Sequence, residues 1–128
     1  MNLVTWIVVA GVFVAFLVLK RLTWVGPTAA RGWLKKGALV IDVRGNGEYQ
    51  ERHLPCAINI PLGQLQQEIT QRALDQEQPL LLHCLSGTRS GMGRRILKQA
   101  GYHHVFNLGS YGRAEKILAA QGGHKRRG

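Results

Sequence analysis

The chain has 128 residues, enough for one domain of ordinary size and too few for two. Its 17 Lys and Arg against 7 Asp and Glu give a formal net charge of +10, but the basic residues are scattered and no aromatic-rich basic motif accompanies them, so nucleic acid is not expected as a partner. The two cysteines show no CxxC spacing, which excludes the common zinc and dithiol motifs, and no metal or other cofactor is expected.

The amino-terminal segment is predicted to be a membrane anchor. Residues 3–19 are uncharged and apolar, and a helix of about 17 to 25 such residues crosses the hydrocarbon layer of a membrane. A cleaved signal peptide is the alternative. However, no basic residue precedes the run, and Lys20 and Arg21 follow it where a small-x-small cleavage site would stand. We therefore expect a single transmembrane helix.

The distribution of charge predicts the orientation of this helix. All Lys and Arg residues lie after Leu19, so the positive-inside rule places the amino terminus outside and the main domain in the cytoplasm, at an inner or plasma membrane. The lipid bilayer is thus an expected partner. We divide the chain into an anchor with a basic flank at 1–21, a folded domain at 22–121, and a basic flexible tail at 122–128, either solvated or in contact with lipid.

Strands and helices are predicted to alternate after the anchor. Residues 22–26 are either a short edge strand or a link in which Trp24 lies at the membrane interface. Pro27 opens a helix that ends before Gly37. Apolar runs predict strands at 38–43, 57–60, 79–83 and 105–108, and amphipathic spacing predicts helices at 62–69, 90–100 and 111–121. Such alternation requires crossover connections, so the expected fold is α/β, a mostly parallel central sheet with helices on both faces.

The segment from Cys84 to Arg89 is a candidate active-site loop. It separates the strand ending at His83 from the helix beginning near Ser90. Cys84 therefore stands at the carboxyl end of a buried strand, where open α/β sheets bind their ligands. The first N–H groups of the helix lack partners and its dipole is positive there, so both a thiolate and a bound anion are favoured at this place.

Four motifs, in this order, resemble the single-domain rhodaneses. They are Asp42-Val43-Arg44 followed by Glu48-Tyr49, the run HLPCAINIP from His53 to Pro61, the run CLSGTRS from Cys84 to Ser90, and Leu97 with Gly101-Tyr102. The match extends over about residues 22–118. The resemblance implies the rhodanese-like three-layer fold, here preceded by one transmembrane helix.

The activity that the resemblance implies is sulfur transfer. Cys84 matches the family's sulfur-carrying cysteine, and the residues matching its substrate-binding loop are Leu85, Ser86, Gly87, Thr88 and Arg89. A Cys84 thiolate would take sulfane sulfur from thiosulfate or a persulfide donor, and the Cys84 persulfide would pass it to a thiol or cyanide acceptor. Gly87 allows the tight turn that directs N–H groups at the sulfur, and Arg89 supplies positive charge for an anionic donor.

The hydroxyls and the histidine near Cys84 are expected to have structural rather than catalytic roles. Ser86, Thr88 and Ser90 carry hydroxyls, one of which could bond a persulfide, but a helix cap formed by Thr88 or Ser90 is the preferred interpretation. His83 precedes Cys84 in a strand and should point to the opposite face, so it is a poor general base for its neighbour.

Three charged residues and the second cysteine complete the candidate set. Asp42, Arg44 and Glu48 either line the mouth of the site or form salt bridges, and salt bridges are the preferred interpretation. Cys56 stands where the family usually has glycine. We interpret it as a small buried residue in a turn rather than as a second thiol of the site.

Two other functions compete with sulfur transfer. Cysteine-dependent phosphatases and arsenate reductases also hold an oxyanion with a cysteine, a loop of N–H groups and an arginine, but the phosphatases have five residues between Cys and Arg, whereas four separate Cys84 from Arg89. A non-catalytic, membrane-tethered rhodanese-like adaptor is the second alternative. Such modules commonly lack the cysteine that this chain retains.

Overall fold

The sheet at the centre of the domain has four parallel strands. The computed structural model describes residues 1–72 and 74–127, with side chains up to residue 120. The strands lie in the order β2-β1-β3-β4, with bounds β1 Leu39–Asp42, β2 Ile58–Asn59, β3 Leu80–His83 and β4 Val105–Gly109. Every neighbouring pair is parallel, so the carboxyl ends of the strands meet at one edge. The four predicted strands are confirmed.

Helices precede, connect and follow the strands. Their bounds are α1 Leu3–Leu22, α2 Pro27–Lys35, α3 Asn46–Glu51, the short 3₁₀ helix η1 Leu62–Gln64, α4 Leu65–Gln71, α5 Thr88–Gln99 and α6 Tyr111–Arg127. Pro27 occupies the first turn of α2, and Gly37 follows its end with a φ of 88°, as predicted from the sequence. The predicted flexible tail, 122–128, lies outside the residues whose side chains are described.

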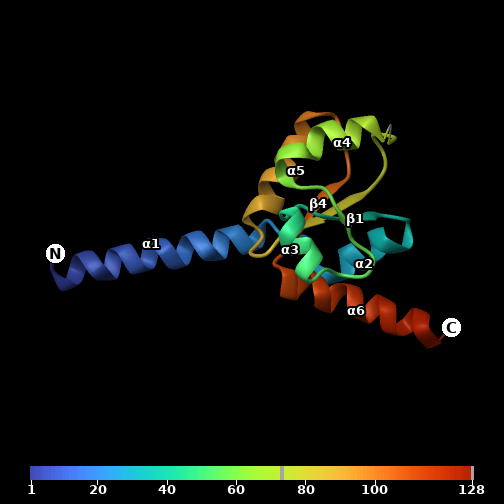
Figure 1. The fold of residues 1–128 in the computed structure, drawn as a ribbon. Coiled ribbons are helices and arrows are strands. Elements are labelled where there is room, and N and C mark those ends of the chain that lie inside the picture. Colours follow the sequence, from blue (N-terminus) through green and yellow to red (C-terminus); the bar gives the residue numbers. More distant parts are fainter. Residues whose placement is uncertain (73, 128) are drawn as a thin grey trace.

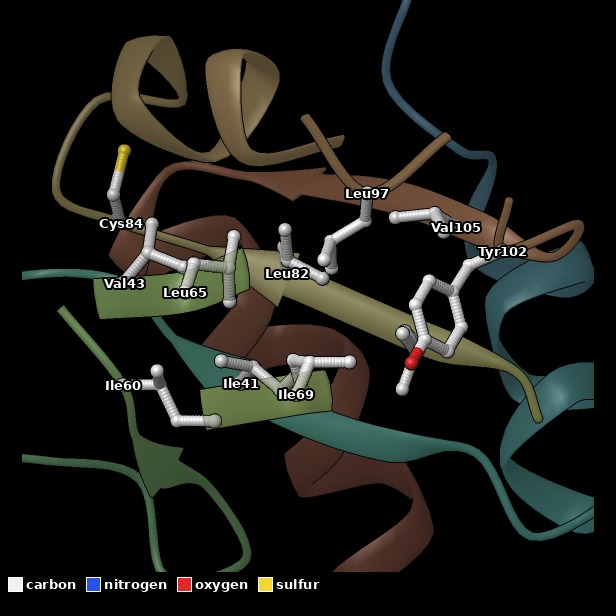
Figure 2. Packing of buried hydrophobic residues seen from close by; sticks show 11 residues of the cluster. Ile41, Val43, Ile60, Leu65, Ile69, Leu82, Cys84, Leu97, Tyr102 and Val105 are labelled. Atoms are coloured by element: carbon white, nitrogen blue, oxygen red, sulfur yellow. The ribbon is translucent and has the colours of Figure 1, made fainter. Parts of the chain in front are cut away.

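Two layers of helices enclose the sheet (Figure 1). α4 and α5 cover one face, over a core that includes Ile41 and Leu82 (Figure 2). α2 and α6 cover the other face, over Val40 and Leu81. Because successive side chains of a strand point to opposite faces, β1 and β3 each place apolar side chains in both cores. Burial of each such side chain contributes roughly 1.5 to 3 kcal/mol to folding. The α/β fold with helices on both faces is confirmed.

Of the two alternatives for residues 22–26 the structure has the link and not the strand, because α1 continues to Leu22 and a turn follows. Two local expectations differ from the structure. α3 was not expected; it begins after Gly45, whose N–H donates to the side chain of Glu48 at 3.1 Å, one of the two hydrogen bonds of a capping box. α5 begins at Thr88, two residues earlier than predicted, because Gly87 adopts a left-handed conformation that ends the loop.

The amino-terminal helix α1 extends away from the domain (Figure 1). None of its residues is buried, and its most apolar stretch has a mean hydropathy of 2.5. By length and composition α1 is able to cross a membrane, a test that a signal sequence also passes. Asn2 caps its first turn by accepting from the N–H of Thr5, and Lys20 and Arg21 stand in its last turn.

Candidate active site at the end of β3

Cys84 lies immediately after β3, beneath the turn that leads into α5. Its side chain is fully buried and stands at the end of the apolar core, with the sulfur directed toward that turn (Figure 2). The backbone N–H of Gly87 donates to Cys84 Sγ at 3.0 Å, and Ser90 Oγ lies 3.4 Å from the same sulfur. The sulfur therefore sits within an arc of donors.

The donors around Cys84 favour its charged form. Burial raises the pKa of the thiol, but the hydroxyl of Ser90 and the N–H groups of Ser90, Gly87 and Ser86 together outweigh burial and hold the pKa below its usual value. The thiolate is the nucleophilic form of cysteine. The surroundings of Cys84 therefore increase the fraction of reactive sulfur at neutral pH.

We expected the hydroxyl of Thr88 or Ser90 to cap α5, but neither does. The residue that caps this helix is Gly87, with φ 90°, and no side chain bonds to the helix end. Ser90 instead faces Cys84, and Thr88 Oγ1 accepts a hydrogen bond from Lys20 Nζ. The capping interpretation is therefore wrong, because the left-handed glycine already ends the loop without one.

Arg89 pairs with Glu48 of α3 and remains within electrostatic range of Cys84; the pKa of the arginine is raised chiefly by Glu48 and, to a smaller extent, by the charge of Cys84. Its guanidinium forms two hydrogen bonds with the carboxylate of Glu48, at 2.7 and 3.1 Å, and the two side chains are 36% and 39% exposed. This contact is the main cause that lowers the pKa of Glu48 to about 2. A bidentate pair of this kind fixes the orientation of Arg89 at the rim of the loop.

Asn107 is a buried residue of the site that the sequence did not single out. It lies on β4, and its amide donates to the carbonyl of Gly87 at 3.0 Å. Its side-chain oxygen lies 2.7 Å from Ser90 Oγ and accepts from the N–H of Gly109 at 2.8 Å. Because Ser90 has one hydroxyl proton, Asn107 and Cys84 Sγ compete for it. Asn107 thus holds both Gly87 and Ser90 in place beside the sulfur.

The link between α1 and α2 also packs against the loop. The indole of Trp24 lies so close to two glycines that a Cβ on Gly87 would stand 2.5 Å from its Cζ2, and a Cβ on Gly109 2.5 Å from its Cε3. The N–H of Val25 donates to the carbonyl of Asn107 at 2.9 Å. The two glycines, both with positive φ, therefore form a seat that only an unsubstituted backbone can provide.

A second set of charged groups lies behind the loop, on the face covered by α6. Arg44 donates to Asp42 through Nη2 at 2.7 Å and through Nε at 3.0 Å, and both residues are buried. His83 Nε2 lies 3.9 Å from Asp42, and its ring packs against Tyr111, away from Cys84 as predicted. Burial lowers the pKa of His83, so its ring is neutral at pH 7. Asp42 and Arg44 have the geometry of a salt bridge.

The second cysteine is placed differently from the prediction. Cys56 is exposed, not buried in a turn. A backbone hydrogen bond from the N–H of Ala57 to the carbonyl of Leu54 closes the turn that contains Cys56. The turn is therefore stabilised by the backbone and not by burial of the cysteine side chain. The described residues contain no group of three or more His, Cys, Asp or Glu able to hold a metal ion.

Comparison with known proteins points to one family. The model of the rhodanese-like domain matches residues 27–112. Thiosulfate sulfurtransferase PspE of Escherichia coli is 39% identical over 69 residues, which cover 54% of this chain and 66% of PspE. Thiosulfate sulfurtransferase GlpE of Coxiella burnetii is 31% identical over 74 residues, covering 58% of this chain and 67% of GlpE. For three curated bacterial relatives the match spans from 36% to 66% of their own length.

Solved structures agree with this result. A rhodanese with anions from E. coli has a TM-score of 0.56 at 36% identity and covers 59% of this chain and 89% of its own. The human single-domain sulfurtransferase TSTD1 shares the fold, with a TM-score of 0.62 at 24% identity over 73% of this chain and 96% of its own. From the family match and the shared fold, the chain belongs to the rhodanese-like domain family and is homologous to thiosulfate sulfurtransferases.

Proposed function

We propose that this protein is a membrane-anchored sulfurtransferase that carries sulfane sulfur on Cys84 as a persulfide. The observation that carries the proposal is the position of Cys84 Sγ, held 3.0 Å from the N–H of Gly87 within an arc of donors that lower its pKa. Homology to thiosulfate sulfurtransferases supports the same reaction class.

The first half-reaction transfers sulfur to the enzyme. The Cys84 thiolate attacks the outer sulfur of thiosulfate, the bond between the two sulfur atoms of the donor breaks, and sulfite leaves with the electron pair. The product is a Cys84 persulfide anion. The N–H groups of Ser86, Gly87 and Ser90, which favour the thiolate, are positioned to stabilise this terminal sulfur as well.

The second half-reaction returns the enzyme to its starting state. An acceptor thiolate or cyanide attacks the terminal sulfur, and Cys84 leaves as thiolate, so no net oxidation of the protein occurs and no cofactor is required. Because Cys84 is fully buried, both donor and acceptor reach it only when the loop opens. Leu85 and Ser86 are the exposed residues next to Cys84, and opening would break the hydrogen bond from the N–H of Tyr111 to the carbonyl of Leu85 and the bridge between Ser86 and Ser110.

Substrate binding is assigned to residues 85–89. The backbone of the loop receives the transferred sulfur, while Arg89 at the rim attracts the anionic part of thiosulfate. Glu48 accepts hydrogen bonds from two guanidinium nitrogens of Arg89 and so fixes the orientation of the arginine. The short cradle of four intervening residues suits a sulfur atom better than a phosphoryl group.

The proposed location rests on the properties of α1. Its exposed, apolar surface and the basic residues after Leu19 support a single-pass anchor in an inner or plasma membrane, with the amino terminus outside and the domain in the cytoplasm. Resistance of the full chain to alkaline carbonate extraction, and protease protection of an amino-terminal tag in sealed inside-out vesicles, test these two statements.

Mass spectrometry tests the chemistry. After incubation of the full chain with thiosulfate, we expect the mass of one additional sulfur atom, located on the peptide that contains Cys84. Cys56→Ser retains the adduct and Cys84→Ser loses it, together with the release of thiocyanate from cyanide. Ser90→Ala raises the pKa of Cys84 and so moves the acidic limb of the pH–rate profile to higher pH. An adduct absent from Cys84, with hydrolysis of phosphate or reduction of arsenate present, would contradict the proposal.

A further inference from the structure

The surface around the inner end of α1 is hollowed and basic. Three hollows of about 420, 620 and 460 Å³ surround this end, and each is lined both by α1 or Trp24 and by the domain. We call this surface the root face. Its basic side chains are Lys20, Arg21, Arg94, Arg95, Arg113 and Lys116. No Asp or Glu of the described residues lines any of the three hollows.

The charges of the root face are not neutralised within the chain. None of its six basic residues forms an ion pair with a carboxylate in the described part of the chain. Arg113 has its pKa lowered first by burial and then by the charge of Arg21, so two like charges are held near each other. A surface of this kind attracts an external anion.

The root face also exposes apolar side chains beside the catalytic loop. Leu85 is 59% exposed and shares a hollow with Val14 and Val18 of α1, and Met92 is 50% exposed and shares another with Phe16. Val14 precedes Leu19, the last residue of the uncharged run, by about 7.5 Å along the helix at 1.5 Å per residue. This depth matches the 5 to 10 Å, roughly, to which apolar side chains of interfacial segments enter a bilayer.

We propose that the root face lies on an anionic phospholipid surface, with its basic side chains on lipid phosphates and with Leu85 and Met92 in the interface. The proposal rests on the membrane anchor proposed above. Figure 1 shows the beginnings of α5 and α6 beside the inner end of α1, so the same helix that enters the bilayer brings the root face against it. The catalytic loop then opens at the headgroup level, and its sulfur donor or acceptor is a molecule held at the membrane surface.

Photo-crosslinking to lipid tests this contact. A benzophenone amino acid is placed at position 85, at position 92, or at position 99, which is exposed at the far end of the same α5 helix. The full chain with Cys84→Ser, which removes sulfur chemistry from the readout, is reconstituted in nanodiscs of phosphatidylcholine with or without phosphatidylglycerol. We expect positions 85 and 92 to crosslink to lipid on the order of fivefold more than position 99, with a further increase in phosphatidylglycerol.

Charge-matched variants separate a specific contact from general attraction. Arg95→Gln with Lys116→Gln removes two charges from the root face and should lower lipid crosslinking at position 85 severalfold. Lys35→Gln with Lys98→Gln removes two exposed charges elsewhere and should leave it unchanged. Equal crosslinking at all three positions, or equal effects of the two pairs, would overturn the inference. Loss of the protein on carbonate extraction would overturn the anchor and this inference with it, and neither outcome bears on sulfur transfer by Cys84.

Discussion

At the scale of single residues, each group around Cys84 is held by another group further from it. Gly87 donates to the sulfur while its carbonyl accepts from Asn107, and Arg89 at the rim is held by Glu48. The Glu48 pair is partly exposed, and pairs of this kind contribute up to about 1 kcal/mol to stability. Its chief effect is to orient the arginine.

Removing the carboxylate of Glu48 gives a prediction with a defined pH dependence. The folded-state pKa of about 2 lies below the ordinary value of 4.5, so the stabilisation is present above pH 4.5 and is lost as the pH falls toward 2. We expect Glu48→Gln to lower the free energy of unfolding at pH 7 by about 0.5 to 1 kcal/mol. The difference from the natural chain should shrink between pH 4.5 and 2, as measured by urea unfolding in mild detergent. Glu51→Gln, an exposed control on the same helix, should have little effect.

At the scale of elements, the link between α1 and α2 joins the anchor to the catalytic loop. Trp24 packs on Gly87 and Gly109, and Arg113 donates both to the carbonyl of Val25 and to that of Leu108. The conformation of the loop thus depends on a tryptophan that lies more than sixty residues before Gly87 in the sequence.

Replacement of Trp24 should therefore affect stability and site together. Trp→Ala in a full core costs about 3 to 5 kcal/mol, and for the half-buried Trp24 we expect about 2 kcal/mol. Trp24→Ala should also raise the pKa of Cys84, measured by the pH dependence of its alkylation in a Cys56→Ser background, because Gly87 loses its support. Trp33→Ala is the matched control, since Trp33 packs on His104 and Phe106, far from the loop. If both variants change the pKa equally, Trp24 does not position the loop.

Features set by local interactions could be predicted from the sequence, whereas features set by tertiary contacts could not. The strands and the cysteine loop were predictable because their signals are local: an apolar run such as 79–83, followed by Cys84 and by a glycine that permits a turn. α3 was missed because Glu48 stabilises its start through a side chain, within a stretch rich in turn residues. Asn107 was not singled out, and Trp24 was considered only as a residue of the membrane interface, because their contacts with Gly87 depend on tertiary packing, which a periodic pattern does not encode.

At the scale of the whole molecule, α1 and the domain are separate packing units joined at one end. None of the α1 residues is buried, and neither core cluster contains any of them. The sheet and its two helical layers therefore stabilise the folded domain. We expect α1 to determine where the catalytic edge of the sheet lies relative to the membrane.

Truncation tests this division. A chain beginning at Leu22 keeps Trp24 and Val25, and we expect it to fold, to retain sulfur transfer and to lose less than about 1 kcal/mol of stability, since it gives up mainly exposed surface. A chain beginning at Pro27 lacks both Trp24 and the backbone bonds of Val25 to Asn107 and Arg113, and should lose more stability than Trp24→Ala. Thermal unfolding by circular dichroism and thiocyanate release measure the two effects. Failure of the longer fragment to fold would show that α1 belongs to the core after all.

The seat formed by the two glycines also has a practical consequence. An indole rests directly on the peptide unit whose N–H faces Cys84 Sγ, so a natural fluorophore is built into the wall of the sulfur cradle. With Trp6 and Trp33 replaced by phenylalanine, the emission of the one remaining tryptophan becomes an optical record of each loading and unloading event, read in real time without any attached dye.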